Sequence, residues 1–370
     1  MSLPGKSFDK KKETHTPQTF WQWFSNNQER FDQLNELNAE EAPARLNEIM
    51  EQLNKYDPWF KALIGKFDDT SSELVITADG DIALFVKVEL LLSAAPPLAG
   101  WRLIAHKPPL GFDEISIEMH GKSFNEETVK FYPLIDPAYP DLVSIVFTHK
   151  DYDEKEEEDF QTAGSIYVQN ALGEINTATQ IDQYKIRSEP EDTSLLIPVV
   201  KLNDYLNWRE KEFVEKYDLA AIDFPEELIN SIEGQDAAGN VMMALAVATY
   251  EHWEYKPVYC WWVRIEVEYP EAENGLPGPD SLQLLHNIED KAVQLLTQNP
   301  GIIYTASKTF KGCRTIYFYA KNYRDPSLLL YEFCESAEGD LKPGFFIEKD
   351  KYWQNMEEFF KLEEDLEEDE

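Results

Sequence analysis

The sequence predicts an α+β protein of two domains, and three observations carry this prediction. First, the chain has 370 residues, which corresponds to roughly two domains of about 100–200 residues each. Second, the C-terminal half follows the order β-α-β-β-α-β, which is typical of a ferredoxin-like unit. Third, the N-terminal half mixes helices with short strands, which predicts helices packed on a mixed or antiparallel sheet. With 43% hydrophobic and 13% aromatic residues, the chain has enough apolar surface for a core in each domain.

The N-terminal half is predicted to begin with amphipathic helices. Phe20, Trp21 and Phe24 lie at helical spacings, and Thr16-Pro17 supplies an N-cap followed by a proline in the first turn. A strand at 73–78 (ELVITA), an apolar helix at 82–95 and a strand at 101–106 then indicate a crossover unit. The other elements follow from the same periodicities: a helix at 43–56, strands at 115–120, 128–135, 141–149 and 182–187, and a helix at 160–175.

The C-terminal half carries the clearest strand pattern. Trp261–Tyr269 (WWVRIEVEY) alternates between apolar and polar residues, as a half-buried strand does. Asp280 is expected to cap a helix that extends to Gln298, with Gln283 in the capping-box position. Further elements are strands at 302–310 and 314–320 joined across Lys311-Gly312, a helix from Asp325, a strand at 344–348, and a turn or helix at 352–360. The segments 231–236 and 241–253 fit either a strand or a helix.

The limits of the domains are predicted from composition. Glu189–Thr193 (EPEDT) is short and polar and contains a proline, which is typical of a linker. We therefore expect a flexible tail at 1–15, an N-terminal domain at 16–188, a linker at 189–200, a C-terminal domain at 201–360 and an acidic tail at 361–370.

The charge balance excludes some classes of partner. The 34 Lys and Arg against 70 Asp and Glu give a net charge of −36, so a cationic face for nucleic-acid phosphates or an anionic membrane is not expected. Two acidic runs, Asp151–Asp159 and 357–370, carry part of the excess, and the rest is spread over the surface, where it ordinarily serves solubility. The alternative is that this acidic protein occupies a cationic surface on a partner.

The chain is expected to lie in the cytoplasm. Its N-terminal residues lack the apolar run of a secretory signal, and no stretch is long and apolar enough for a membrane span. Cys260, Cys313 and Cys334 form no CxxC pair, which fits a reducing compartment and favours neither a disulfide framework nor a zinc site.

The C-terminal half resembles a bacterial family catalogued as domain of unknown function 695. The stretches that carry the resemblance are VRIEVEY with NGLPGPD, HNIEDKAVQLL, KGCRTIYFYA and KDKYW, within roughly Trp253–Phe360. The N-terminal half is similar to a region often fused to that domain, through FWQWF, ELVITADGD and SAAPPLAGW. The resemblance implies a fold akin to the ferredoxin-like ribonuclease E inhibitor family and therefore a binding role, and it supplies no catalytic residues.

No residue pattern points to a known catalytic site. His106, His120 and His149 lie at or near the ends of three predicted strands, where they would suit a metal or acid/base site, although strand-end histidines are ordinarily surface or satisfied residues. Cys313 has only Lys311 and Arg314 close in sequence and is expected to be an inert thiol. We therefore assign no catalytic residue, metal site or cofactor.

One segment departs from the acidic character of the chain. Between Gly301 and Arg324 there is no acidic residue, and there are five basic ones: Lys308, Lys311, Arg314, Lys321 and Arg324. The ordinary interpretation is that Arg314 and its neighbours pair with Glu266 and Glu268 on an adjacent strand. The alternative is a site for an anion or an acidic partner, formed by these five cations beside Trp262 and Tyr317.

The sequence thus predicts a non-catalytic interaction or regulatory protein that binds a protein partner, and not nucleic-acid phosphates or a membrane. The alternative is an enzyme or a small-ligand-binding protein with a pocket between its domains. A deep pocket with convergent polar groups would favour the alternative, whereas a flat exposed aromatic or acidic face would favour the interaction protein.

Overall fold

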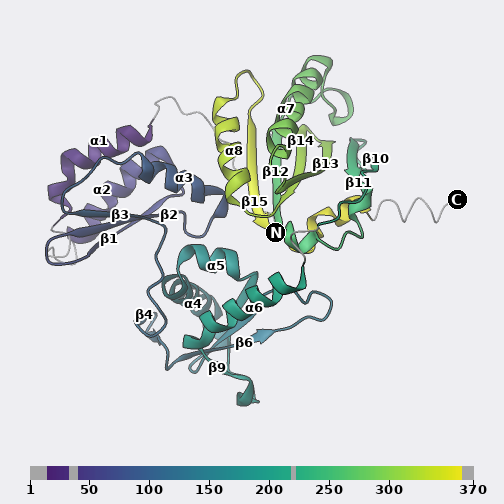
Figure 1. Ribbon diagram of the computed structural model, residues 1–370. Helices are drawn as coiled ribbons and strands as arrows, with labels where there is room; N and C mark the ends of the chain where they lie inside the picture. The colour runs from purple at the N-terminus through teal and green to yellow at the C-terminus, as the bar shows by residue number, and fades with distance from the viewer. Residues whose placement is uncertain (1–14, 33–40, 218–221, 361–370) are drawn as a thin grey trace. The chain divides into compact units, whose positions relative to one another are not determined.

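The fold is a mixture of helices and several sheets, as predicted (Figure 1). The structure is a computed structural model that describes residues 15–32, 41–217 and 222–360. Two compact units divide the chain between Phe213 and Val214. The predicted tails at 1–15, apart from His15, and at 361–370 lie outside the described residues.

A three-stranded sheet and three helices form the first part of the N-terminal unit. These elements are α1 (Pro17–Asn27), α2 (Glu41–Tyr56), β1 (Lys61–Lys66), β2 (Ser72–Thr77), α3 (Ile82–Ser93) and β3 (Trp101–Ala105). The strand β2 pairs antiparallel with β1 and parallel with β3, so α3 is the predicted crossover connection. Sequence analysis missed β1, whose residues KALIGK show little alternation.

The helix α1 begins as its sequence predicts. The Thr16 hydroxyl oxygen accepts a hydrogen bond from the Thr19 N–H at 3.3 Å. The buried indole N–H of Trp21 donates to the carbonyl oxygen of Leu91 at 2.6 Å, which ties α1 to the end of α3.

The apolar helix α3 carries one buried cation. Lys87 is 9% exposed, and its Nζ lies 2.9 Å from Oδ2 of Asp57, which is 3% exposed. The other oxygen of Asp57, Oδ1, accepts the Trp59 N–H at 2.9 Å. The Lys87 ammonium also lies 5.1 Å from the ring centre of Tyr56. Both charges are thus removed from water and depend on each other for compensation.

A four-stranded sheet and a small hairpin form the second part of the N-terminal unit. The elements are β4 (Ile117–Met119), β5 (Lys122–Phe124), β6 (Val129–Leu134), β7 (Ser144–His149), α4 (Glu157–Leu172), α5 (Glu174–Gln180), β8 (Gln183–Arg187), β9 (Ile197–Pro198) and α6 (Leu202–Lys216). The sheet order is β8-β7-β6-β9. The acidic run 151–159 leads into the first turn of α4, where carboxylates are favourable at the positive end of the helix dipole.

The predicted linker at 189–200 is instead part of the N-terminal unit. Ile197 in β9 pairs with Phe131 in β6, and Val199, Leu202 and Leu206 are buried in the same core as Phe131. The helix α6, which sequence analysis did not assign, therefore starts on the N-terminal core. The division after Phe213 lies near the end of this helix, so the predicted start of the C-terminal domain at 201 is about a dozen residues too early.

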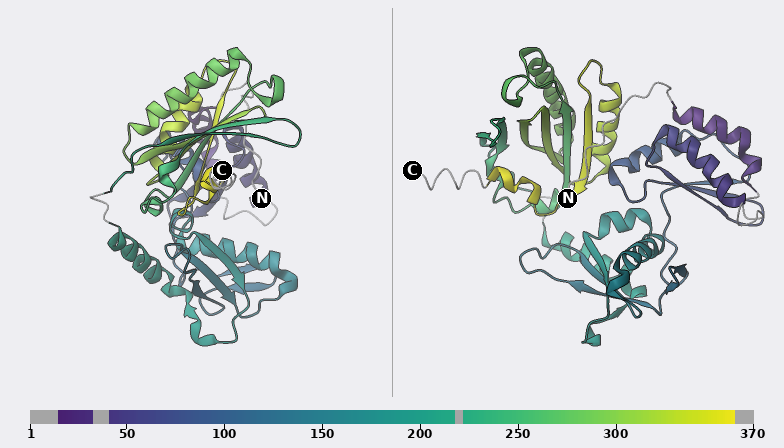
Figure 2. Two further views of the ribbon diagram at one scale, coloured as in Figure 1. Left: turned by 90° about the vertical axis from the view of Figure 1, so that its right-hand side faces the viewer. Right: turned by 180° about the vertical axis from the view of Figure 1, so that it is seen from behind.

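A six-stranded antiparallel sheet with two helices forms the C-terminal unit. Its elements are β10 (Ile229–Gln235), β11 (Val241–Val247), β12 (Trp261–Glu268), α7 (Pro279–Thr297), β13 (Ile302–Phe310), β14 (Cys313–Ala320), α8 (Arg324–Ser336) and β15 (Pro343–Lys349). The strand order is β10-β11-β13-β14-β12-β15. The helices contact each other and pack on β13 and β15, on the same side of the strands (Figure 2). The predicted sheet of β12, β13 and β14 under α7 is confirmed.

Local details of this unit correct one prediction, the Asp280 cap, and confirm two. The helix α7 starts at Pro279 after Gly278, and Asp280 lies in its first turn instead of capping it, because proline is pre-organised for the first helical position. The last predicted element, 352–360, is a 3-10 turn at Gln354–Met356 followed by helical residues from Glu357. In the β13–β14 turn, Lys311 and Gly312 both have positive φ, 47° and 70°, as a two-residue hairpin requires.

Candidate functional site

The predicted basic site at the β13–β14 hairpin is occupied by the protein's own carboxylates. Arg314 is 9% exposed and forms an ion pair with Glu289 of α7, and its guanidinium also donates to the Thr309 hydroxyl oxygen at 3.2 Å. The Nζ of Lys308 lies 2.8 Å from Glu358. Arg314 therefore lies under α7 and not in a solvent-facing group of cations.

The remaining basic residues contact different parts of the C-terminal unit. The Lys311 Nζ lies 2.7 Å from Asp236, and this ion pair, ahead of the hydrogen bonds from Asn240, lowers the pKa of Asp236. Lys321 and Arg324 lie over the rings of Tyr259 and Tyr323. The expected pairing with Glu266 and Glu268 is wrong, since Glu266 pairs with Arg264 at 3.2 Å.

Trp262 and Tyr317 meet on the face of the sheet opposite α7. Their rings stack at 5.8 Å between centres, and they are only 7% and 5% exposed. Phe359 covers Tyr317 edge-on at 5.4 Å. The C-terminal segment thus packs on these aromatic residues, so their position favours a role in the core over direct ligand contact.

Cys313 has the environment of an inert thiol. Its side chain is partly buried, and its Sγ lies 3.8 Å from the Thr315 hydroxyl. Burial raises the pKa of the Cys313 thiol, which lowers the thiolate fraction at neutral pH that a nucleophile needs.

The three strand-end histidines take part in separate contacts. His120 is exposed and its Nδ1 lies 3.7 Å from Asp159, beside a cavity of about 10 Å³, the space of a single water. His149 is 1% exposed and is held by the Ser123 carbonyl. His106, 2% exposed, belongs to the network described next. Within the ranges that the structure describes, no group of three or more His, Cys, Asp or Glu is placed to hold a metal ion.

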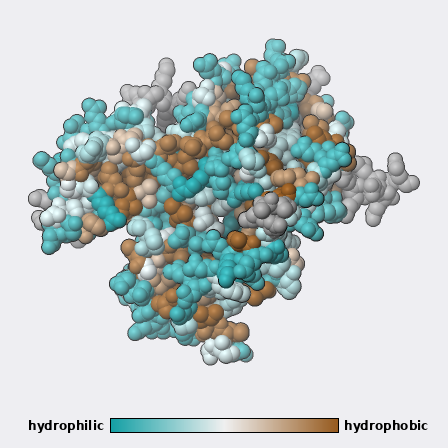
Figure 3. Space-filling view, in the orientation of Figure 1, coloured by the Kyte–Doolittle hydropathy of each residue, from teal (hydrophilic) through white to brown (hydrophobic). Residues whose placement is uncertain are grey.

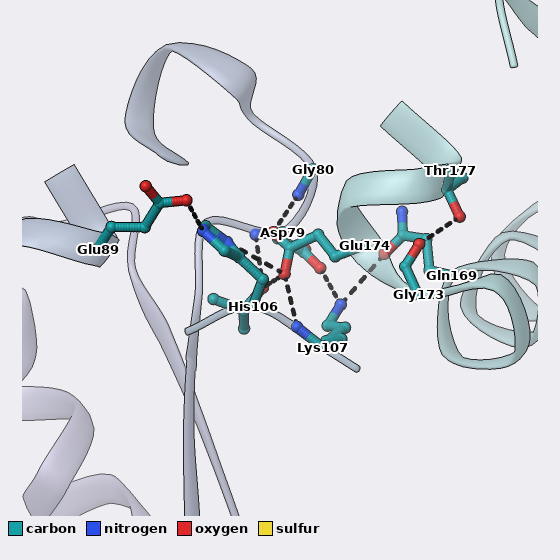
Figure 4. A network of polar contacts seen from close by, with 10 residues as sticks. Asp79, Gly80, Glu89, His106, Lys107, Gln169, Gly173, Glu174 and Thr177 are labelled. Atoms are coloured by element: carbon teal, nitrogen blue, oxygen red, sulfur yellow. Dashed lines mark hydrogen bonds and ion pairs between the residues drawn. The ribbon is translucent and has the colours of Figure 1, made fainter. Parts of the chain in front are cut away.

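A buried polar network of the N-terminal unit surrounds Glu174, which is 1% exposed at the start of α5 (Figure 4). Its carboxylate accepts the Thr77 hydroxyl at 2.5 Å, the Gly80 N–H at 2.9 Å and the Lys107 N–H at 3.0 Å. Gly173 allows this approach, since its φ is +88° and a Cβ there would lie 2.9 Å from the Pro109 nitrogen. One carboxylate therefore joins the end of β2, the turn after it and the end of β3 to α5.

Charged groups continue this network toward the surface. Nδ1 of His106 lies 3.9 Å from Glu174, and its Nε2 lies 3.4 Å from Glu89. The Lys107 ammonium lies 2.5 Å from Asp79 and 3.1 Å from the side-chain oxygen of Gln169. The network crosslinks elements far apart in sequence, and we therefore assign it to positioning these elements. The sequence does not predict this network, because the residues that bind Glu174 lie 67 to 97 residues from it.

The buried His149 predicts a loss of stability in acid. Burial of its imidazole lowers the pKa of His149 below the ordinary value of 6.5. Below that pH the unfolded chain binds a proton that the folded chain does not, so stability falls as pH falls from about 6.5 to the folded pKa. We expect urea unfolding to show a steeper loss between pH 7.5 and 5.5 in the wild type than in His149→Gln, by up to about 1.4 kcal/mol per pH unit. Parallel pH profiles of the two proteins would contradict this.

The C-terminal sheet has an exposed apolar edge that sequence analysis missed. We call it the β10 edge patch: Ile229, Met243 and Leu245, which are 54%, 44% and 41% exposed. Leu245 pairs with Ser231 and Met243 with Glu233, so the side chains of alternate residues share one face. Figure 3 shows brown hydrophobic residues among teal hydrophilic ones on the visible face of the molecule. The run VMMALAV is apolar at every position and shows no alternation. The sequence therefore does not indicate which of its side chains face solvent.

Among the described residues, no helix combines the length and the apolar character that crossing a membrane requires.

Neither the curated proteins nor the solved structures include a match to this chain. The model of the family described as "Family of unknown function (DUF695)" matches residues 211–360, a segment that includes the β10 edge patch. This match confirms the resemblance that the sequence predicted: the C-terminal half of the chain is similar to the DUF695 family.

Proposed function

We propose that the protein is a non-catalytic interaction protein and that it binds a protein partner at the β10 edge patch. The observation that carries the proposal is an edge strand beside three exposed apolar side chains on one face of the sheet. Burial of apolar surface is worth roughly 25 cal/mol per Å², and contiguous exposed apolar patches mark interaction sites more often than isolated apolar residues do.

The sequence of β10 supports this proposal. Natural edge strands are commonly protected by lysine, proline or bulges that prevent pairing with another chain. The strand INSIEGQ contains neither lysine nor proline and carries one charge, Glu233. Its pairing with β11 runs from Ile229 to Gln235 without a register shift. Within residues 15–32, 41–217 and 222–360 no strand covers this edge, so the described part of the chain leaves it open to a partner where a strictly monomeric protein would be expected to block it.

We also propose that the C-terminal unit is ferredoxin-like and that the protein acts in the cytoplasm. The chain order β12-α7-β13-β14-α8-β15 and the spatial order β13-β14-β12-β15 support the first proposal, with β10 and β11 added at one edge. The thiols of Cys313 and Cys334, which form no disulfide, support the second.

Replacing two residues of the patch is expected to abolish partner capture. Met243→Thr with Leu245→Thr removes apolar area and keeps residues that suit strands. The full chain, wild type or double variant, serves as bait in its native lysate, and quantitative mass spectrometry measures the captured proteins. We expect the double variant to capture at least tenfold less of a specific partner than the wild type, although the two baits have the same melting temperature.

A matched control comes from the other unit. Leu63 in β1 is 42% exposed, so Leu63→Thr makes the same kind of change elsewhere. It is expected to retain the partner. Equal retention by the wild type, the double variant and the control would contradict the proposed binding surface.

A further inference from the structure

The open side of β10 fits an additional strand. We infer that the partner contributes an extended, basic polypeptide segment that pairs with β10 as a seventh strand of the C-terminal sheet. This inference rests on the proposed function and specifies the chemistry of its partner. Backbone pairing with an exposed sheet edge is a general mode of peptide recognition.

The hydrogen bonds of the β10–β11 hairpin show which backbone groups face outward. The Ala248 N–H donates to the Leu228 carbonyl at 2.9 Å, and the Asp236 N–H donates to the Asn240 carbonyl at 3.0 Å. Both bonds involve even-numbered residues at the two ends of β10, and antiparallel pairs alternate between bonded and non-bonded positions. The N–H and C=O groups of the odd-numbered residues therefore point away from β11. These residues are Ile229, Ser231, Glu233 and Gln235.

These outward groups have no strand partner within the part of the chain that the structure describes, since β10 is the last strand of its sheet there. The side chains of the same four residues are exposed. The four residues whose backbone groups point outward thus also place their side chains on one face of the sheet, the face that carries Met243 and Leu245. An added strand would gain main-chain hydrogen bonds and place every second side chain against the patch.

The charge around the edge selects a cationic partner. Residues 222–255 contain seven Asp or Glu and no Lys or Arg. Of these acids, Asp236 pairs with Lys311, whereas Glu233 lies on the exposed face of β10. Complementary charge across an interface steers association and rejects like-charged partners. A second copy of this chain would bring the same acid-only segment to the edge, so a basic segment of another protein fits better.

The test uses a peptide of alternating valine and lysine, ten residues long with blocked ends, and the full chain. Amide hydrogen exchange at Ile229, Ser231, Glu233 and Gln235 is expected to slow at least tenfold when the peptide is added. The same peptide with N-methylated valines keeps its charge and loses the backbone donors, and we expect it to bind at least tenfold more weakly. A valine–glutamate peptide should not bind.

Two variants of one residue separate strand pairing from nonspecific attraction. Ser231→Pro removes an outward N–H and leaves the bonds to β11 intact, because proline is tolerated where the N–H faces solvent on an edge strand. It is expected to weaken peptide binding at least tenfold, whereas Ser231→Ala leaves it unchanged. Equal binding of the N-methylated peptide, or exchange protection elsewhere only, would overturn the inference. So would a wild-type dimer, detected by sedimentation, that Ser231→Pro dissociates.

The natural partner distinguishes the inference from the proposed function. If the Met243→Thr, Leu245→Thr variant loses the partner and Ser231→Pro retains it, the binding surface stands and strand addition is wrong. If both variants retain it, both proposals are wrong.

Discussion

Lys87→Met is expected to lower the free energy of unfolding of the N-terminal unit by about 3–5 kcal/mol, the usual cost of removing one partner from a buried ion pair. Asp57 is 3% exposed, so without the ammonium its charge would stay buried with the hydrogen bond from the Trp59 N–H and without its cation. The measurement is urea unfolding of the full chain, followed by tryptophan fluorescence and circular dichroism.

A second substitution tests whether the loss comes from the unpaired charge. Asp57→Asn keeps an oxygen that accepts the Trp59 N–H and removes the charge. In the Lys87→Met background it should therefore recover most of the lost stability, since neutral replacement of a buried pair is often tolerated. A Lys87→Met variant with nearly wild-type stability, or no recovery in the double variant, would contradict the role of this pair.

Arg314→Glu is expected to unfold the C-terminal unit or to destabilise it by at least about 3 kcal/mol. The new carboxylate would face Glu289 under α7, where the side chains of Arg314 and Glu289 are 11% and 12% exposed. Two like charges with little access to water repel strongly. Thermal unfolding followed by near-UV circular dichroism measures the effect.

Lys311→Glu provides the matched charge reversal in the same hairpin. Lys311 is half exposed, and its partner Asp236 lies at the surface of the β10–β11 turn. Its reversal is expected to leave the thermal midpoint nearly unchanged, because exposed ion pairs contribute little. A thermal midpoint of Arg314→Glu as close to the wild-type value as that of Lys311→Glu would show that Arg314 is not a structural residue.

The partner of Arg314 shows what the sequence leaves undetermined in a sheet. Arg314 pairs in register with Val267, so it shares a face with that valine, while Glu266 and Glu268 on either side of it face the other way. A shift of one residue would have brought the expected pair together. Alternation identified β12 and β14 correctly, but local sequence does not set the register between two strands that are joined through a helix and a hairpin.

Long-range pairing explains the misplaced domain boundary. Glu189–Thr193 has the composition of a linker, yet Ile197 closely follows it and pairs with Phe131, about 65 residues earlier. The spacing of Leu202 and Leu206 by one helical turn could have predicted α6, and both residues are buried in the structure. Predicting the acidic, apolar edge at β10 would have required both the strand assignment and the sheet order. Neither follows from the run VMMALAV, which fits a strand or a helix.

Glu174 also makes the two parts of the N-terminal unit depend on each other during folding. The groups that bind its carboxylate, from Thr77, Gly80 and Lys107, lie 97, 94 and 67 residues earlier in the chain. Closing loops of this length costs conformational entropy that only the completed set of contacts repays. The first sheet leaves these donors without their acceptor until α5 has docked. The unit should therefore gain much of its cooperativity from one acidic side chain, and truncation between the two sheets should weaken both.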